Sequence, residues 1–178
     1  MMMAETDFEA RLVENWDRIY RLALRVTGNR HEASDVVQET MASAFASRHR
    51  FRGEARISTY LYRIGLNQAW ALLRKKKSAA GVLDKPDLVP DRRDNPAQAF
   101  QKGEKQAELA GAVDRLPDRQ KVAVHLRIYE QLSFDEIGRV LGCRTATART
   151  NYFFGLQNLR KIIGSPKGSR STGEVNNT

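Results

Sequence analysis

The sequence predicts an all-α fold of two small helical domains, an N-terminal three-helix domain and a C-terminal helix-turn-helix domain, joined by a flexible linker. Apolar residues recur every three or four positions through residues 8–77 and 116–163, which is the period of helices that bury one face. A polar stretch punctuated by Gly81, Pro86 and Pro90 separates the two parts. Near the C-terminal end, a short helix with a capping motif, a glycine and a longer helix with polar residues on its first turns are predicted in the order of a helix-turn-helix.

Composition indicates a soluble globular protein with a polyanionic partner. Of the 178 residues 41% are hydrophobic and 29% charged, the net charge is +9 and the sequence pI is about 10.0. No apolar run reaches the length that crosses a bilayer, and the start MMMAETDFEA is not a signal peptide. We therefore expect a cytoplasmic protein with no membrane insertion.

Catalytic and metal sites are not expected. Cys143 is the only cysteine, and His31, His49 and His125 are scattered without ligand spacing. No paired carboxylates and no glycine loop for phosphates stand out. We expect no cofactor, no metal and no catalytic residue.

The first two predicted helices cover residues 8–26 and 32–47, with Gly28-Asn29 between them. The first buries Leu12, Trp16, Ile19, Ala23 and Val26, and the second buries its own stripe from Ala33 to Phe45. The other face of the second helix is polar and acidic, at Asp35, Gln38 and Glu39. This face is either simply solvated or a surface for a positively charged protein partner.

The third predicted helix follows a turn at Gly53, with Ser58 or Thr59 as its N-cap, and runs to Lys77. Residues 48–77 carry nine Lys or Arg against the single Glu54, interleaved with aromatic rings. Cations neutralise phosphates while rings stack on unpaired bases, so the pattern suits a nucleic acid with exposed bases. An amphipathic helix with an aromatic core and a charged, solvated face explains it equally well.

Residues 78–96 are predicted to be the linker, and residues 97–164 the second domain. After a weakly amphipathic helix at 97–113, Pro117 begins a helix buried at Val122, Leu126 and Tyr129. The Ser133-x-x-Glu136 capping box starts a short helix that ends at Gly142. Thr145 is the predicted cap of a longer helix that ends near Ile163 and is buried through Tyr152, Leu156, Leu159 and Ile163. An ordinary helical hairpin is the alternative to a helix-turn-helix here; the tail 165–178 is predicted to be disordered.

Two sets of motifs resemble one family. In the first half they are residues 19–28 (IYRLALRVTG), 35–40 (DVVQET) and 51–67 (FRGEARISTYLYRIGLN). In the second half they are residues 116–120 (LPDRQ), 132–143 (LSFDEIGRVLGC) and 158–160 (NLR). Together they resemble, in order, the extracytoplasmic-function group of RNA polymerase sigma factors, in the sigma-70 family. The resemblance implies region 2 at residues 1–77 and region 4 at residues 97–164.

The resemblance also implies partners and site residues. Region 2 would bind the clamp coiled coil of core RNA polymerase through Asp35, Gln38 and Glu39, with the polymerase flap as a further contact of the chain. It would capture a flipped base of the non-template strand at the minus-ten element. The residues implied for that single-stranded DNA are Phe51, Arg52, Arg56, Tyr60, Arg63, Asn67, Arg74 and Lys75. Phe51 would stack on the base, Asn67 would bond its edge, and the two would form one pocket.

Region 4 would read the duplex of the minus-thirty-five element in the major groove. The implied residues are Arg144, Thr145, Arg149, Thr150, Phe153 and Phe154. An anti-sigma factor is a further implied partner.

The chain departs from the family pattern at several of these positions. Tyr60 stands where the family usually has Trp, and Ala71 where many members have Asp. Ala146-Thr147-Ala148, Asn151 and Phe153-Phe154-Gly155 replace the usual Gly-Thr-Val, Arg and His-Arg-Ala or Phe-Arg-Ala. Losing arginines there weakens the expected phosphate anchoring and changes the expected sequence preference.

Three functions compete. The leading hypothesis is a sigma factor that directs core polymerase to a two-part promoter and helps to melt it. The alternative is a stand-alone helix-turn-helix regulator of duplex DNA, which needs neither an acidic docking face nor a base-capture loop. An enzyme acting on nucleic acid is third, because no constellation for its chemistry is present.

Overall fold

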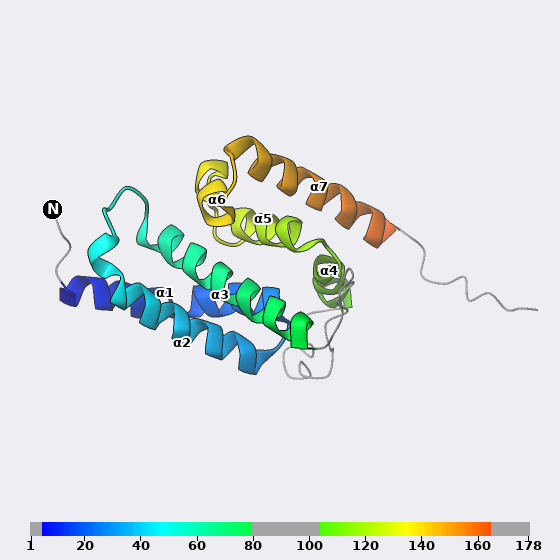
Figure 1. The fold of residues 1–178 in the computed structure, drawn as a ribbon. Coiled ribbons are helices and arrows are strands. Elements are labelled where there is room, and N and C mark those ends of the chain that lie inside the picture. The colour runs from blue at the N-terminus through cyan, green and yellow to red at the C-terminus, as the bar shows by residue number, and fades with distance from the viewer. Residues whose placement is uncertain (1–4, 80–103, 165–178) are drawn as a thin grey trace, which may run out of the picture.

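The computed structural model describes residues 5–79 and 104–164, and within them it contains helices and no strand (Figure 1). The elements are α1 (Glu5–Thr27), α2 (Arg30–Ala46), the 3-10 turn η1 (Arg48–Arg50), α3 (Ile57–Ala79), α4 (Glu104–Asp114), α5 (Asp118–Ile128), α6 (Phe134–Leu141) and α7 (Thr145–Gly164). Helices α1–α3 pack as one bundle and α4–α7 as a second, and the two bundles meet where α3 contacts α6 and α1 contacts α5. The predicted all-α fold in two helical domains is confirmed.

A tight helix crossing organises the first bundle. Gly65 on α3 has no side chain, and a Cβ there would lie 3.1 Å from the Ile19 side chain and 3.3 Å from the Thr40 hydroxyl. All three residues are buried, so the glycine lets α3 approach both α1 and α2. Leu22, Val37, Leu61 and Leu66 complete the centre of this core.

The buried stripe of α1 differs from the prediction at one position. Trp16 was expected inside, but it is 39% exposed, and Asn15 is buried in its place. Asn15 satisfies its amide by donating to the Arg11 carbonyl, 2.8 Å away on the preceding turn. Because a buried amide needs only such a local partner, hydrophobicity alone gave the wrong residue.

Helix ends in this bundle also differ by a few residues. Asn29 caps α2 by accepting from the backbone of His31 and Glu32, so α2 starts at Arg30 instead of residue 32. The prediction of Ser58 or Thr59 as the cap of α3 is wrong. The Tyr60 amide donates to the Arg56 carbonyl, so the first turn of α3 begins at Arg56 and already contains Ser58 and Thr59.

The second bundle confirms the helix-turn-helix signals. Ser133 and Glu136 form the reciprocal capping box, and Gly142 ends α6 with φ of 64°. Thr145 is not the cap but the first residue of α7, since the Ala148 amide bonds to the Arg144 carbonyl. Tyr129 and Ile163, expected inside, are 59% and 44% exposed. Tyr129 follows the last residue of α5, and in the last turn of α7 it is the neighbouring Ile162, not Ile163, that packs against the core of the second bundle.

The predicted linker at 78–96 is wrong at its start, because Ser78 and Ala79 continue α3. Its other residues, the beginning of the helix predicted at 97 and the predicted disordered tail 165–178 lie outside the described residues.

Candidate nucleic-acid interface

Phe51 in the loop before α3 and Tyr60 on its first turn are two aromatic rings packed at a tilt. Phe51 is half-buried, with ring centroids 6.1 Å from Phe8 and 5.3 Å from Tyr60. The Tyr60 hydroxyl is in turn hydrogen-bonded to the Ser47 hydroxyl at 2.7 Å. The rings are therefore held by packing and by the hydrogen bond to Ser47, and Phe51 stays partly exposed. Gly53, with φ of 72°, turns the exposed loop that follows.

A polar stripe continues from this loop along α3. Tyr60, Arg63, Asn67 and Arg74 recur at spacings of three, four and seven residues, which places them on one side of the helix. Arg63, Asn67 and Arg74 are exposed. Seven residues of helix rise about 10 Å, so Asn67 lies about 10 Å along the axis from Tyr60. The Tyr60 ring and the Asn67 amide thus lie at two points along one exposed side of α3, and the pocket expected from Phe51 and Asn67 stays a prediction.

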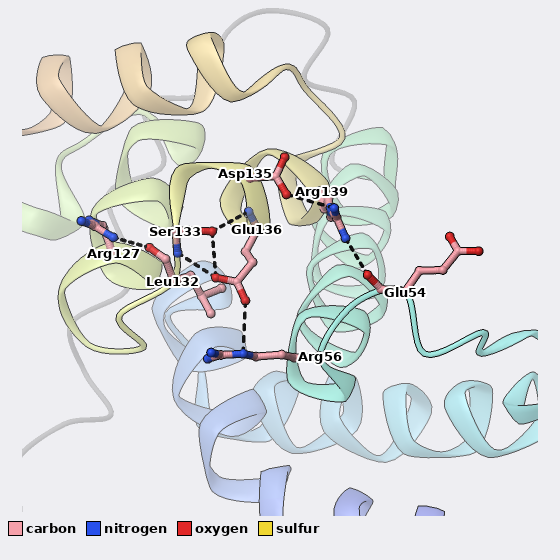
Figure 2. A network of polar contacts seen from close by, with 8 residues as sticks. All are labelled: Glu54, Arg56, Arg127, Leu132, Ser133, Asp135, Glu136 and Arg139. Atoms are coloured by element: carbon pink, nitrogen blue, oxygen red, sulfur yellow. Dashed lines mark hydrogen bonds and ion pairs between the residues drawn. The ribbon is translucent and has the colours of Figure 1, made fainter. Parts of the chain in front are cut away.

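The remaining cations of this surface are accessible. Arg52 and Arg56 in the loop and Lys75 at the end of α3 are exposed. Next to Lys75, Lys76 pairs with Glu32 of α2, which ties the end of α3 to the bundle. Arg56 faces the second bundle, where its Nε lies 3.7 Å from Glu136 (Figure 2).

The acidic face of α2 is also exposed as predicted. Asp35, Gln38 and Glu39 point to solvent, opposite the buried residues Val36, Val37 and Thr40. Only Glu39 has a described polar contact, from the Ser43 hydroxyl at 3.4 Å. In a chain of net charge +9 these side chains are available to a partner of opposite charge.

The turn between α6 and α7 is held closely. A Cβ on Gly138 would lie 2.8 Å from the Cys143 carbonyl oxygen, so the glycine is required for the turn to fold back on α6. Beyond it, Arg144 is exposed just before α7, and Thr145, Arg149 and Thr150 are exposed on its first turns. The Thr145 hydroxyl is 3.4 Å from Asp135, and that of Thr150 donates to the Ala146 carbonyl. This is the arrangement with which a recognition helix reaches base edges.

An aromatic cluster beside α7 was missed by the sequence analysis. Phe134, Tyr152 and Phe153 pack together, with ring centroids 5.4–6.3 Å apart. The guanidinium carbon of Arg149 lies 5.4 Å from the centre of the Phe134 ring, and that of Arg127 lies 4.9 Å from it. Phe134 therefore supports Arg149, while Phe153 and Phe154 are each 52% exposed. The one hint of this cluster in the sequence was the aromatic Phe134 next to the capping residue Ser133.

Two titratable groups lie buried between the bundles. Burial, and then the neighbouring Glu130 carboxylate, raise the pKa of the Tyr62 hydroxyl far above its usual value, so it stays protonated and donates to Glu130. Burial, and then Arg25 and Arg21, lower the pKa of His125 to about 4. The Glu130 carboxylate, 4.0 Å from His125, would favour the charged imidazole, but it already faces Arg18, Arg21 and Tyr62.

Within the described ranges, no cluster of three or more His, Cys, Asp or Glu is placed to hold a metal ion. No helix in the same ranges is long and apolar enough to cross a membrane.

Comparison with protein families matches both bundles. The family model of Sigma-70 region 2 matches residues 12–79, and that of Sigma-70, region 4 matches residues 106–159. The chain is 35% identical over 149 residues to the ECF RNA polymerase sigma factor SigE of Mycolicibacterium smegmatis, covering 83% of this chain and 58% of that relative. It is 31% identical over 157 residues to the ECF RNA polymerase sigma factor SigW of Bacillus subtilis, covering 83% of both chains.

Two solved structures share the fold. One is the sigma factor RpoE in complex with the anti-sigma factor NepR from Bartonella quintana, with a TM-score of 0.72 and 19% identity over 90% of this chain and 99% of that one. The other is CnrH in complex with the cytosolic domain of CnrY, with a TM-score of 0.66 and 17% identity over 90% of each chain.

Proposed function

Because the chain belongs to the sigma-70 family of RNA polymerase sigma factors, in its extracytoplasmic-function group, we propose that its two bundles divide promoter recognition between them. As an alternative sigma factor it acts in transcription initiation, binding core RNA polymerase and promoter DNA. The proposal concerns which residues do so. It assigns core binding and minus-ten melting to residues 1–77 and minus-thirty-five recognition to residues 97–164.

The observation that carries this division is that the chain exposes two surfaces of different chemistry, the stripe along α3 and the first turns of α7. The α3 stripe combines rings, an amide and cations, which suit unstacked bases and their phosphates. The α7 start combines exposed Arg149 and Thr150 with a helix-turn-helix, which suits base edges in a major groove. A stand-alone duplex regulator has no use for the α3 stripe or the acidic face of α2, so that alternative is not favoured.

In this proposal the energy of binding unpaired bases drives the separation of the promoter strands, and no catalytic residue is needed. Flipping a base costs a few kcal/mol of stacking, and the partly exposed Phe51 ring and the Asn67 amide farther along α3 are proposed to offset that cost. Arg52, Arg56, Arg63, Arg74 and Lys75 then hold the phosphates of the separated strand. We place this activity in the cytoplasm and propose no cofactor. Since the structural neighbour RpoE is bound to the anti-sigma factor NepR, an anti-sigma factor is also a proposed partner of this chain.

The test separates core binding from melting. Asn67→Ala should reduce promoter opening, measured by reactivity of unpaired thymines, while polymerase binding is unchanged. Gln68→Ala is the matched control, since that amide donates to Ser43 at 3.3 Å on a different face. Equal loss of opening and core binding in Asn67→Ala would contradict the assignment.

A double variant tests whether the acidic face of α2 binds core polymerase. Asp35→Arg with Gln38→Ala should abolish co-purification with core polymerase, because it reverses the charge on an exposed face. Glu9→Arg reverses an exposed charge on α1 and should have no effect. Undiminished co-purification of the α2 variant would remove the docking assignment.

A further inference from the structure

We propose that Phe154 of α7 reads one pyrimidine of the upstream duplex through the methyl group on C5 of that base. Region 4 then distinguishes thymine from uracil or cytosine at this position by an apolar contact, without a hydrogen bond. The inference rests on the proposed function, because it takes α7 to lie in a major groove. It goes further in assigning one chemical group of the DNA to one side chain.

The rotation of α7 about its own axis is fixed by its packing on the second bundle (Figure 1). The buried side of α7 consists of Ala148, Gly155 and Leu159. Gly155 lets α7 approach α5 closely, since a Cβ there would lie 2.7 Å from the Val124 side chain. At about 3.6 residues per turn, Thr150 lies nearly opposite this buried side. Phe154, four residues later, is one turn farther along the same exposed side.

The two exposed rings of α7 differ in what holds them. Phe153 belongs to the aromatic cluster, with ring centroids 6.3 Å from Phe134 and 5.4 Å from Tyr152. Phe154 is equally exposed, at 52%, but makes no ring or cation–π contact with another described residue. The Phe154 ring is therefore available to a partner, whereas Phe153 packs against the ring that supports Arg149.

The charge of α7 indicates what that partner is. Its 20 residues include Arg149, Arg160 and Lys161 and no acidic residue. Arg149 and Arg160 are exposed on the same outer side as the two rings. A face with cations and no anion suits a polyanion, because it neutralises phosphates. We therefore assign duplex DNA to this face and to the Phe154 ring within it.

The chemistry of the major groove selects the base. The groove edges of the four base pairs present hydrogen-bond donors and acceptors and one apolar group, which is the C5 methyl of thymine. A phenyl ring over a donor or acceptor would remove it from water and leave it unpaired, at a cost in affinity. Phe154 has no polar atom in its side chain, so the methyl is its favourable partner. Because 5-methylcytosine carries the same methyl, the recognised class is the 5-methylpyrimidines.

The methyl contact and the contact of Arg149 fall on different base pairs. Five residues of helix rise about 7.5 Å, which corresponds to about two steps of duplex at 3.4 Å each where α7 follows the groove. Phe154 therefore adds a second specified position to the guanine proposed for Arg149. Each position can be tested without changing the other.

The test removes the methyl group alone. Core polymerase with the wild-type chain first selects an upstream element from a randomised promoter library, and each thymine of the selected duplex is then replaced in turn by deoxyuridine. One buried methyl corresponds to about fourfold in affinity, so one of these replacements should weaken wild-type binding about fourfold. Phe154→Ala should lose at least as much on the thymine duplex and should not distinguish thymine from uracil at that position.

A methyl on another base gives an independent measurement. With cytosine at the same position, methylation at C5 should strengthen binding of the wild-type chain by a similar factor. It should have no effect on Phe154→Ala. Phe154→Leu keeps an apolar side chain and should keep part of the preference for the methyl.

Tyr129→Ala is the matched control. It removes a ring that is 59% exposed at the end of α5, and it should leave the ratio of thymine to uracil affinity as in the wild type. Melting followed by circular dichroism checks that each variant is folded. Because about half of Phe154 is exposed, Phe154→Ala should change the melting temperature little.

The outcomes separate this inference from the proposed function. If no thymine depends on its methyl, or if the preference survives Phe154→Ala, the inference is overturned. A preference that disappears in Phe153→Ala and not in Phe154→Ala would assign the contact to the other ring. If the polymerase with this chain enriches no upstream element, the proposed function fails and the inference with it. Enrichment without a preference for the methyl refutes the role of Phe154 alone.

Discussion

Replacing Arg149 tests how region 4 reads DNA. The guanidinium carbon lies 5.4 Å from the centre of the Phe134 ring, and Arg149 is exposed on α7, so we propose that it makes two parallel bonds to a guanine. Arg149→Ala should cost about 1–3 kcal/mol at a single base pair, which is roughly 5- to 150-fold in affinity. Arg149→Lys keeps the charge but loses the fork, and should lose most of the same discrimination.

The supporting ring should contribute through Arg149 alone. Phe134→Leu keeps an apolar side chain but removes the cation–π contact, worth about 0.5–1 kcal/mol at an exposed site. That loss should vanish in the Arg149→Ala background, because the two residues act as one unit. Arg127→Ala is the matched control. It removes a guanidinium from the same ring and a bond to the Leu132 carbonyl, and should lower stability without changing base preference.

The assay uses the full chain with core polymerase and a promoter library randomised in its upstream element. Enrichment of each base at each position is compared between wild type and variant. The expected result is relaxed preference at one position. A uniform loss over all positions would show that Arg149 contacts phosphate, and the reasoning from its stacked geometry would be refuted.

Three further changes test the fold beneath the site. Gly155→Ala places a Cβ 2.7 Å from the buried Val124 side chain and should destabilise region 4 by about 1–3 kcal/mol in a melting experiment, whereas Gly164→Ala, with open space around it, should not. Ser133→Ala removes the cap of α6 and should cost about 1 kcal/mol in denaturant titration; an unchanged midpoint would contradict the role of the box. Because the pKa of His125 falls from 6.5 unfolded to about 4 folded, its contribution to stability is complete above pH 6.5 and lost as the pH falls towards 4. His125→Gln should make the free energy of unfolding depend less on pH between 6.5 and 4. An unchanged dependence on pH would show that other groups cause it.

Local signals in the sequence gave the helices and the exposure of the site residues. The capping box at Ser133 and the left-handed turn at Gly142 depend on residues a few positions apart, and both are confirmed. Asp35, Asn67 and Arg149 were expected at the surface and lie there. Their roles in binding stay predictions.

What the sequence did not reveal depends on residues far apart in the chain. Tyr62 was an unremarked part of an aromatic run, yet its hydroxyl bonds to Glu130, 68 residues later and in the other bundle. Trp16 looked like a core residue until the local bond of Asn15 showed that an amide could take its place. Such contacts are set by how the bundles pack, which the helical period does not encode.

Transcription in vitro tests the central claim most directly. Purified core RNA polymerase is given genomic fragments with and without this chain, and the start sites are mapped. The account predicts a set of starts that requires the chain, shares an upstream and a downstream element, and is lost with Asp35→Arg and Gln38→Ala. The absence of any start that depends on the chain would contradict it.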